Sequence, residues 1–220
     1  MTETLPAVPP TWAFDRPEAT FINAARITHL FSLGLPLAGK RVLEVGAGVG
    51  RLSLLLEAGG CVVTATEGRA ENVTENIRRN PWRQGQAFCV DVMEPGGHRR
   101  FLPVDVILCY GLLYHLADPA AALRELGALA VPLIAVESQI IAGSGPALRE
   151  HKDNWDCDQS LDRRASHFTL DWLVEAIRAA GWPVVTVPRR QPDHPDFRGQ
   201  SGDRHRRVVL GSYAPLELKP

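Results

Sequence analysis

The middle of the chain alternates short apolar runs with longer segments in which apolar residues recur every three or four positions. The apolar runs cover residues 41–45, 61–66, 86–90, 104–110 and 131–136. These runs predict buried strands. The segments between them predict helices over 50–58, 69–79 and 119–130. Alternating strands and helices indicate a mostly parallel sheet with helices on both faces.

The last part of the chain departs from this alternation. A helix predicted over 170–180 ends at Gly181, a residue type favoured just after a helix. Two further strands, 183–187 and 206–212, follow with no helix between them. Consecutive strands without a crossover helix pair antiparallel, so we expect seven strands with an antiparallel strand at one edge.

The chain is expected to form a single domain over residues 1–220, a length that supports one proper core. Asp15 is the expected N-cap, and Pro17 the first-turn residue, of an N-terminal helix to about Gly34, so residues 1–35 form a helical cap. Residues 137–168 are long, polar and without clear periodicity, which is typical of a lid-like insertion.

Composition narrows the class of protein. The formal net charge is −1, which gives no bulk attraction to nucleic acid or to an anionic membrane. No apolar run approaches the length of a membrane span, and no basic segment followed by an apolar core suggests a secretory leader. Cys61, Cys89 and Cys109 fall in or at the ends of predicted strands, so we expect reduced cysteines and a cytoplasmic protein.

Three glycines at alternate positions follow the first strand directly. A dinucleotide-binding turn needs glycines at positions one, three and six, but the sixth position counted from Gly46 is Arg51. A phosphate-binding loop ending in Gly-Lys-Ser/Thr is absent as well. Glu44 ends the strand, and a carboxylate there suits a cationic ligand better than a pyrophosphate.

The pattern Glu44-x-Gly46-x-Gly48-x-Gly50 resembles the first motif of class I S-adenosylmethionine-dependent methyltransferases. The resemblance implies S-adenosyl-L-methionine as the cofactor and a seven-stranded Rossmann-like α/β sheet. It also implies that the ligand lies at the carboxyl ends of the strands.

The resemblance assigns roles to the ends of the next strands. Glu67 ends the second strand and is expected to bond the two ribose hydroxyls, because one carboxylate can accept two hydrogen bonds. Asp91 is expected to contact the adenine amino group, and Val92 to pack on the ring. The full set of expected cofactor contacts is Glu44, Gly46, Ala47, Gly48, Gly50, Glu67, Gly68, Asp91, Val92, Cys109 and Tyr110.

The segment 111–119 resembles the Leu-x-His-x-x-Asp-Pro segment of many small-molecule methyltransferases, and its tyrosine is also found in enzymes that modify wobble uridine in tRNA. His115 is the candidate catalytic base for a hydroxyl nucleophile, with Tyr114 beside it. The alternative interpretation is that His115 caps a helix or bonds a carbonyl while Tyr114 packs.

Two polar loops supply further candidates. Trp155 in the insertion is a candidate for stacking on a substrate ring, whereas the nearby acidic residues lack calcium-loop spacing, so no metal is expected. In the loop 188–205, residues 190–197 resemble a Thr-Gln-Pro-x-His-x-x-Phe segment of bacterial methyltransferases, a likeness that implies no substrate. From the N-terminal helix, Thr20, Asn23 and Arg26 are the expected pocket residues.

The sequence therefore predicts an enzyme that transfers a methyl group to an oxygen or nitrogen of a small molecule or glycan. A tRNA substrate is the first alternative, which the near-neutral charge disfavours. The second is a non-catalytic partner subunit, which the intact glycine turn disfavours. Besides the acceptor, the one partner that we expect as a possibility is a second copy of the chain in a homo-oligomer. Neither a nucleic acid nor a membrane is expected as a partner.

Overall fold

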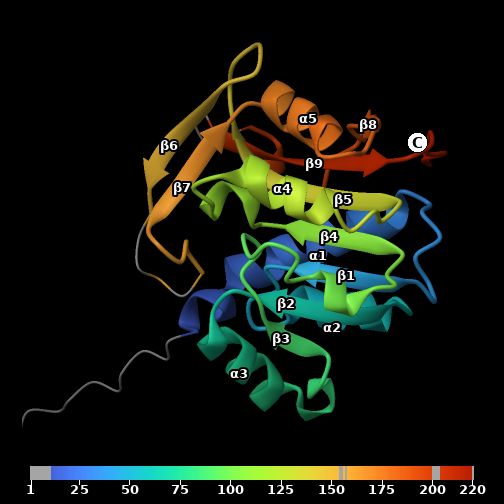
Figure 1. Cartoon of the computed structure of the whole chain (residues 1–220), viewed down its shortest axis with the longest axis vertical. Helices are drawn as coiled ribbons and strands as arrows, with labels where there is room; N and C mark the ends of the chain where they lie inside the picture. The colour runs from blue at the N-terminus through green and yellow to red at the C-terminus, as the bar shows by residue number, and fades with distance from the viewer. Residues whose placement is uncertain (1–10, 154–155, 157, 200–203, 220) are drawn as a thin grey trace, which may run out of the picture.

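A seven-stranded sheet forms the centre of the molecule (Figure 1). The structure is a computed structural model that describes residues 11–153, 156, 158–199 and 204–219. The strand order is β3-β2-β1-β4-β5-β9-β8. The strands are β1 (Arg41–Val45), β2 (Val62–Glu67), β3 (Ala87–Cys89), β4 (Val106–Tyr110), β5 (Leu133–Ile141), β8 (Val184–Thr186) and β9 (Arg204–Ser212).

The predicted pairing is confirmed. Strands β1 to β5 run parallel to one another, and β9 pairs antiparallel with both β5 and β8 at one side of the sheet. The described part of the connection between β8 and β9, residues 187–199, contains no α-helix, and strands joined without a crossover helix pair antiparallel.

Helices cover both faces, and in Figure 1 α4 and α5 lie on the opposite side of the sheet from α1 and α2. The α-helices are α1 (Pro17–Ser32), α2 (Arg51–Ala58), α3 (Ala70–Arg79), α4 (Pro119–Gly127) and α5 (Leu170–Ala179). Short 3-10 helices are η1 (Trp12–Asp15), η2 (Pro81–Arg83), η3 (Arg99–Phe101), η4 (Leu113–His115) and η5 (Pro195–Phe197). Within the described ranges no helix is both long and apolar enough to cross a membrane.

The two cores follow from the alternation of side chains along each strand. In β4, Ile107 and Cys109 join the core under α4 and α5, whereas Val106, Leu108 and Tyr110 join the core under α1 and α2. A strand covered on both faces needs apolar residues at every position, which is why β4 reads as a continuous apolar run.

The predicted insertion contains regular structure that the sequence analysis missed. Strand β5 continues to Ile141, and β6 (Leu148–Lys152) then pairs antiparallel with β7 (Arg164–Phe168) as a separate two-stranded sheet. All five residues of β6 are exposed, so this strand has no apolar face to reveal its period. In Figure 1 the hairpin extends beside the carboxyl ends of the central strands.

Glu44 corrects the expectation that its carboxylate faces a ligand. Its side chain points to the α2 side of the sheet, is only 2% exposed, and accepts a hydrogen bond from the Ser53 hydroxyl. Burial raises the pKa of Glu44 to about 7, while the hydrogen bond from Ser53 opposes that rise. The side chain therefore fastens β1 to α2 beneath the glycine turn, and it lines neither cavity described below.

Glu44→Gln should flatten the dependence of stability on pH. A carboxyl whose pKa rises from 4.5 to about 7 on folding stabilises the protein fully below pH 4.5, and that stability is lost as pH rises through about 7. The loss amounts to about 3 kcal/mol. Urea unfolding at several pH values measures it; Glu175→Gln, at an exposed site on α5, is the control. Equal pH profiles for Glu44→Gln and the wild type would contradict this role.

Gly127→Ala should destabilise the fold. A Cβ at Gly127 would lie 1.8 Å from the carbonyl oxygen of Ala180, so α4 and the end of α5 would have to separate. Overpacking of this kind costs about 1–3 kcal/mol, measurable as a lower midpoint of thermal unfolding. Ala128→Ser, at the exposed next residue, is the matched control and should leave the midpoint within a degree or so.

Candidate active site

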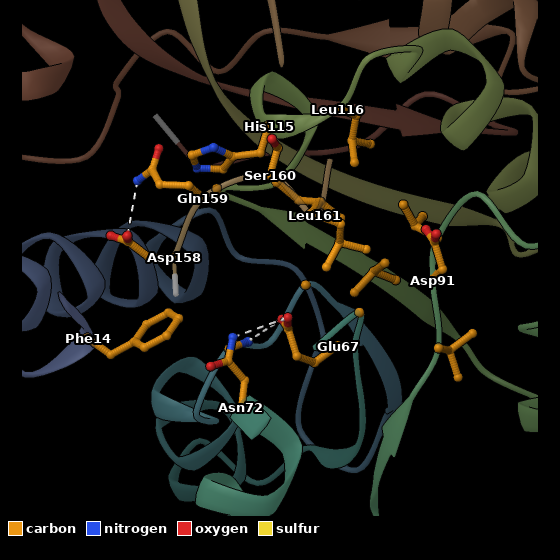
Figure 2. A pocket seen from close by; sticks show the side chains of 18 residues that line it. Phe14, Glu67, Asn72, Asp91, His115, Leu116, Asp158, Gln159, Ser160 and Leu161 are labelled. Carbon is orange, nitrogen blue, oxygen red and sulfur yellow. Dashed lines mark hydrogen bonds between the residues drawn. The ribbon is translucent and has the colours of Figure 1, made fainter. Parts of the chain in front are cut away.

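Two adjoining cavities lie at the carboxyl ends of the parallel strands. We call the first the turn cavity; Figure 2 shows its lining. The second, the α1 cavity, has a volume of about 500 Å³. Residues that line both are Phe14, Gly46, Gly48, Gly111, His115, Asp158 and Gln159. The position agrees with the expectation for an open parallel sheet, where ligands bind beyond the carboxyl ends of the strands.

The glycine turn needs its glycines for conformation and for space. Gly46, Gly48 and Gly50 have φ values of +75°, +53° and +79°. A Cβ on Gly48 would lie 2.5 Å from the ring of Phe14, and one on Gly50 2.4 Å from the Asn76 side chain. Gly46 and Gly48 line both cavities. Ala47 lines the α1 cavity, while Gly50 starts α2 and lines neither.

Glu67 lies at the centre of the turn cavity (Figure 2). One carboxylate oxygen accepts from the backbone N–H of Gly48 at 2.9 Å; the other accepts from the backbone N–H of Arg69 at 3.0 Å and from Asn72 Nδ2 at 3.3 Å. A carboxylate oxygen can accept two hydrogen bonds, so the oxygen that is bonded to Gly48 has room for a ligand hydroxyl. Gly68, the next residue, also lines the cavity.

Asp91 lies on the side of the turn cavity opposite Phe14 (Figure 2), and Val92 lines the same cavity. The exposed carboxylate of Asp91 accepts from the backbone N–H of Met93 at 2.9 Å, and Val92 is buried. Leu116 and Leu161 add further apolar surface to the lining. The cavity thus combines carboxylates with apolar side chains in its lining.

The side chains of Cys109 and Tyr110, at the end of β4, point to opposite faces of the sheet. The side chain of Cys109 is fully buried under α4 and α5 and lines neither cavity, so the contact with the cofactor that the resemblance implies is left to its backbone. Burial raises the pKa of the Cys109 thiol to about 12. Tyr110 points to the other face and lines the α1 cavity, and its buried hydroxyl has no hydrogen-bond partner among the described residues.

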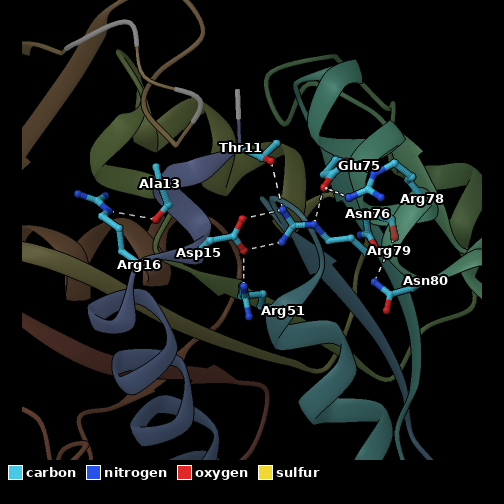
Figure 3. A network of polar contacts seen from close by, with 10 residues as sticks. All are labelled: Thr11, Ala13, Asp15, Arg16, Arg51, Glu75, Asn76, Arg78, Arg79 and Asn80. Atoms are coloured by element: carbon cyan, nitrogen blue, oxygen red, sulfur yellow. Dashed lines mark hydrogen bonds and ion pairs between the residues drawn. The ribbon is translucent and has the colours of Figure 1, made fainter. Parts of the chain in front are cut away.

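The segment before α1 is tied down by ion pairs, and Asp15 is part of that network instead of the expected N-cap (Figure 3). Arg79 binds both carboxylate oxygens of Asp15, at 2.7 and 2.8 Å, and Arg51 donates to the same group. The N-cap of α1 is Arg16, with no side-chain cap bond. Since Arg51 and Arg79 belong to α2 and α3, the network holds η1 in place and sets Phe14 over the glycine turn.

His115 stands where the two cavities meet, and it has a carboxylate partner. Its Nδ1 lies 2.8 Å from Asp153 Oδ2, which also accepts from the backbone N–H of Ser160 at 3.2 Å. The pair joins η4 to the end of the β6–β7 hairpin. The sequence analysis named His115 but treated Asp153 as part of a solvated loop, because the two residues meet only through the tertiary fold.

Residues 158–161, the cover segment, close one side of the turn cavity. Arg69 donates to the carbonyl oxygens of Gln159 and Ser160, at 3.4 and 2.7 Å. Arg16 pairs with Asp158 at 3.0 Å. A Cβ at Gly68 would lie 2.9 Å from Leu161, so the cover segment packs closely on the end of β2. Trp155, the expected stacking residue, lies outside the described residues.

A buried cluster of charge, which the sequence analysis missed, forms one wall of the α1 cavity. Glu137 is fully buried, and Arg26 Nη2 and Arg206 Nη1 donate to its two oxygens at 2.5 and 3.1 Å. Arg206 Nη2 also donates to the Tyr114 hydroxyl at 3.0 Å. Asn23 lines this cavity as expected, whereas Thr20 is exposed and does not.

The ionic state of the cluster follows from its contacts. Burial acts to raise the pKa of Glu137, but the two guanidinium groups outweigh it and hold that pKa below its ordinary value. Burial acts to lower the pKa of Arg206, yet Tyr114 and Glu137 raise it above the ordinary value of an arginine. Arg26, Arg206 and Glu137 therefore carry two positive charges and one negative charge.

Comparison with known proteins identifies the family of this chain. A family model described as a methyltransferase domain matches residues 16–187. The ubiquinone biosynthesis O-methyltransferase of Bordetella parapertussis is 33% identical over 129 residues, which are 53% of this chain and 51% of that protein. The chain thus spans about half the length of the curated relatives it matches first.

Solved structures agree in fold. The N-terminal domain of EvdMO1, solved in the presence of S-adenosylhomocysteine and D-fucose, is 21% identical with a TM-score of 0.69, covering 90% of this chain and 84% of that one. A 1,6-didemethyltoxoflavin-N1-methyltransferase of Burkholderia thailandensis, solved with S-adenosylhomocysteine and its named acceptor, is 23% identical with a TM-score of 0.58, covering 93% and 81%.

These matches confirm the family and the fold that the sequence predicts, and the ligand of both neighbours is the demethylated form of the expected cofactor. The family model spans most of the chain, from the segment before α1 to the residue after β8. The chain therefore belongs to the methyltransferase-domain family, and its fold is that of the class I S-adenosylmethionine-dependent methyltransferases.

Proposed function

We propose that this protein transfers the methyl group of S-adenosylmethionine to a hydroxyl oxygen of a small molecule, with His115 as the proton acceptor. The observation that carries the proposal is the position of the His115–Asp153 pair at the junction of the turn cavity and the α1 cavity. The cofactor belongs in the first cavity and the acceptor in the second.

The residues of the turn cavity fit S-adenosylmethionine. Glu67 offers carboxylate oxygens to a diol, Asp91 offers an acceptor to an amino group, and Val92 supplies apolar surface to a ring. The backbone at Gly48 comes close to the cavity because no Cβ intervenes. The bound cofactor supplies a methyl group already activated on a sulfonium, so the protein needs only to align an acceptor and accept its proton.

His115 suits the second task. The Asp153 carboxylate can only accept, so the His115 ring carries its proton on Nδ1 and donates it to Asp153. The unprotonated Nε2 of His115 can then act as a base. Nε2 takes the hydroxyl proton as the acceptor oxygen bonds to the methyl carbon. The cofactor bound in the turn cavity would supply the methyl carbon, and its sulfur would keep the electron pair of the carbon–sulfur bond that breaks.

Tyr114 has a supporting role in this proposal. Its ring lies 4.1 Å from the His115 ring, and its hydroxyl accepts from Arg206. These contacts hold the wall of the α1 cavity next to the base, so Tyr114 is a positioning residue and not a second base.

Glu67→Ala should weaken the binding of S-adenosylhomocysteine, because the ribose hydroxyls lose their carboxylate partner. The expected loss is about 1–3 kcal/mol, measured by titration calorimetry. Glu71→Ala, at an exposed site on α3, is the control and should bind like the wild type. No heat for the wild type at millimolar ligand would remove the proposed function, whereas an unchanged affinity in Glu67→Ala would remove only the role of Glu67.

His115→Ala should lower kcat for methylation of a phenolic or sugar hydroxyl by about 10²–10⁴ without changing the affinity for S-adenosylhomocysteine. Asp153→Asn should lower kcat by a smaller factor, and Asp153→Glu should restore part of it, because the carboxylate orients the ring. Product mass gives the rate. His151→Ala, on exposed β6, is the matched control. Full turnover by His115→Ala would assign His115 to structure alone.

A further inference from the structure

We propose that the α1 cavity selects acceptors that carry a carboxylate besides the hydroxyl to be methylated, and that Arg206 and Arg26 bind this group. The inference rests on the proposed function, since it names the class of acceptor for the same site. It begins from the buried cluster of Arg26, Glu137 and Arg206, which methyl transfer itself does not need.

The cluster has one positive charge more than it needs to satisfy Glu137. The side chains of Arg26 and Arg206 are 9% and 15% exposed, and that of Glu137 is not exposed at all. Glu137 has both oxygens occupied, so it neutralises one guanidinium and leaves the charge of the other. A buried cation without an equal counter-charge is costly, and an anionic ligand in the adjoining cavity would offset that cost.

Other charged groups near the cluster offset its positive charge only in part. Asp196 accepts from Arg206 Nε at 3.3 Å, but its side chain is 44% exposed, so solvent weakens its effect on the buried guanidinium. The acidic groups Glu18 and Asp158 also line the cavity, and Asp158 is paired with Arg16. Glu18 is exposed at the start of α1.

Unused donors point to the same conclusion. The Tyr110 hydroxyl and Arg26 Nε are buried without a hydrogen-bond partner in the part of the chain that the structure describes, and both residues line the α1 cavity. Buried donors of this kind are normally satisfied, so a site at which two are unpaired beside a cavity is one that a ligand completes. An acceptor with several oxygen atoms would complete it.

The candidate anion site and the base share one cavity. Arg206 lies 5.0 Å over the ring of Tyr114, and that ring lies 4.1 Å from the ring of His115. Arg206, Tyr114 and His115 all line the α1 cavity, so one ligand in it meets both the guanidinium and the imidazole. Hydroxybenzoates and hexuronates both carry a carboxylate and a hydroxyl on one ring, which makes them the two acceptor classes to compare.

The test compares each acid with its own carboxamide. The protein saturated with S-adenosylhomocysteine is titrated by calorimetry with hydroxybenzoates, hexuronates and the matching carboxamides. We expect at least one acid to bind about tenfold or more tightly than its amide, because hydrogen bonds to a charged group are the stronger ones. The series in which the difference appears identifies the ring type.

Arg206→Gln should bring the ratio of acid to amide affinity to about one and leave S-adenosylhomocysteine affinity unchanged. Arg124→Gln, at an exposed arginine on α4, is the matched control and should keep the wild-type ratio. If Arg206→Gln does not fold, the ratio of acid to amide affinity in the wild type still tests whether the cavity selects a carboxylate.

The outcomes separate the two proposals. Equal affinity for acid and amide, or no binding of any acid at about 10 mM, overturns the carboxylate inference while methyl transfer stands. Failure of the wild type to bind S-adenosylhomocysteine at all removes the proposed function first. A retained preference for acids in Arg206→Gln would overturn the role of Arg206.

Discussion

The alternation of side chains along a strand is the constraint on which the arrangement of the site depends. A parallel strand covered on both faces sends successive residues into different layers. Glu44, Tyr110 and Glu137 all fall on the face covered by α1 and α2, and Arg206 on β9 follows the same parity. Strands β1, β4, β5 and β9 thus place ionisable or polar groups on the same side of the sheet, where Tyr110 and Arg206 line the α1 cavity.

The same constraint explains the errors at the strand ends. Proximity in sequence to the glycine turn suggested that Glu44 faces the ligand, but its parity turns it toward Ser53 of α2. Cys109 and Tyr110 are neighbours in sequence, yet only Tyr110 reaches a cavity. The sequence shows which side chains of a strand face which layer only when one face of the strand is polar. Strand β4 is apolar throughout, so its sequence does not show this.

Local patterns were enough to predict the sheet, the glycine turn and the placement of Glu67 and Asp91, because each depends on residues close together in the chain. The β6–β7 hairpin was not predictable in this way, since β6 is exposed at every position. The contacts that complete the site were also out of reach. His115 meets Asp153 across 38 residues, and Arg26 meets Glu137 across 111, pairings that only the tertiary fold brings about.

The Arg26–Glu137–Arg206 cluster also bears on how such a site diverges. The three residues come from α1, β5 and β9, and each satisfies a buried charge on another. Removing one partner of a buried pair leaves an uncompensated charge, which costs several kcal/mol. A lineage that comes to use a different acceptor therefore has to exchange all three positions together. Positions 26, 137 and 206 should covary among related chains, and their joint identity would mark subfamilies more sharply than any loop.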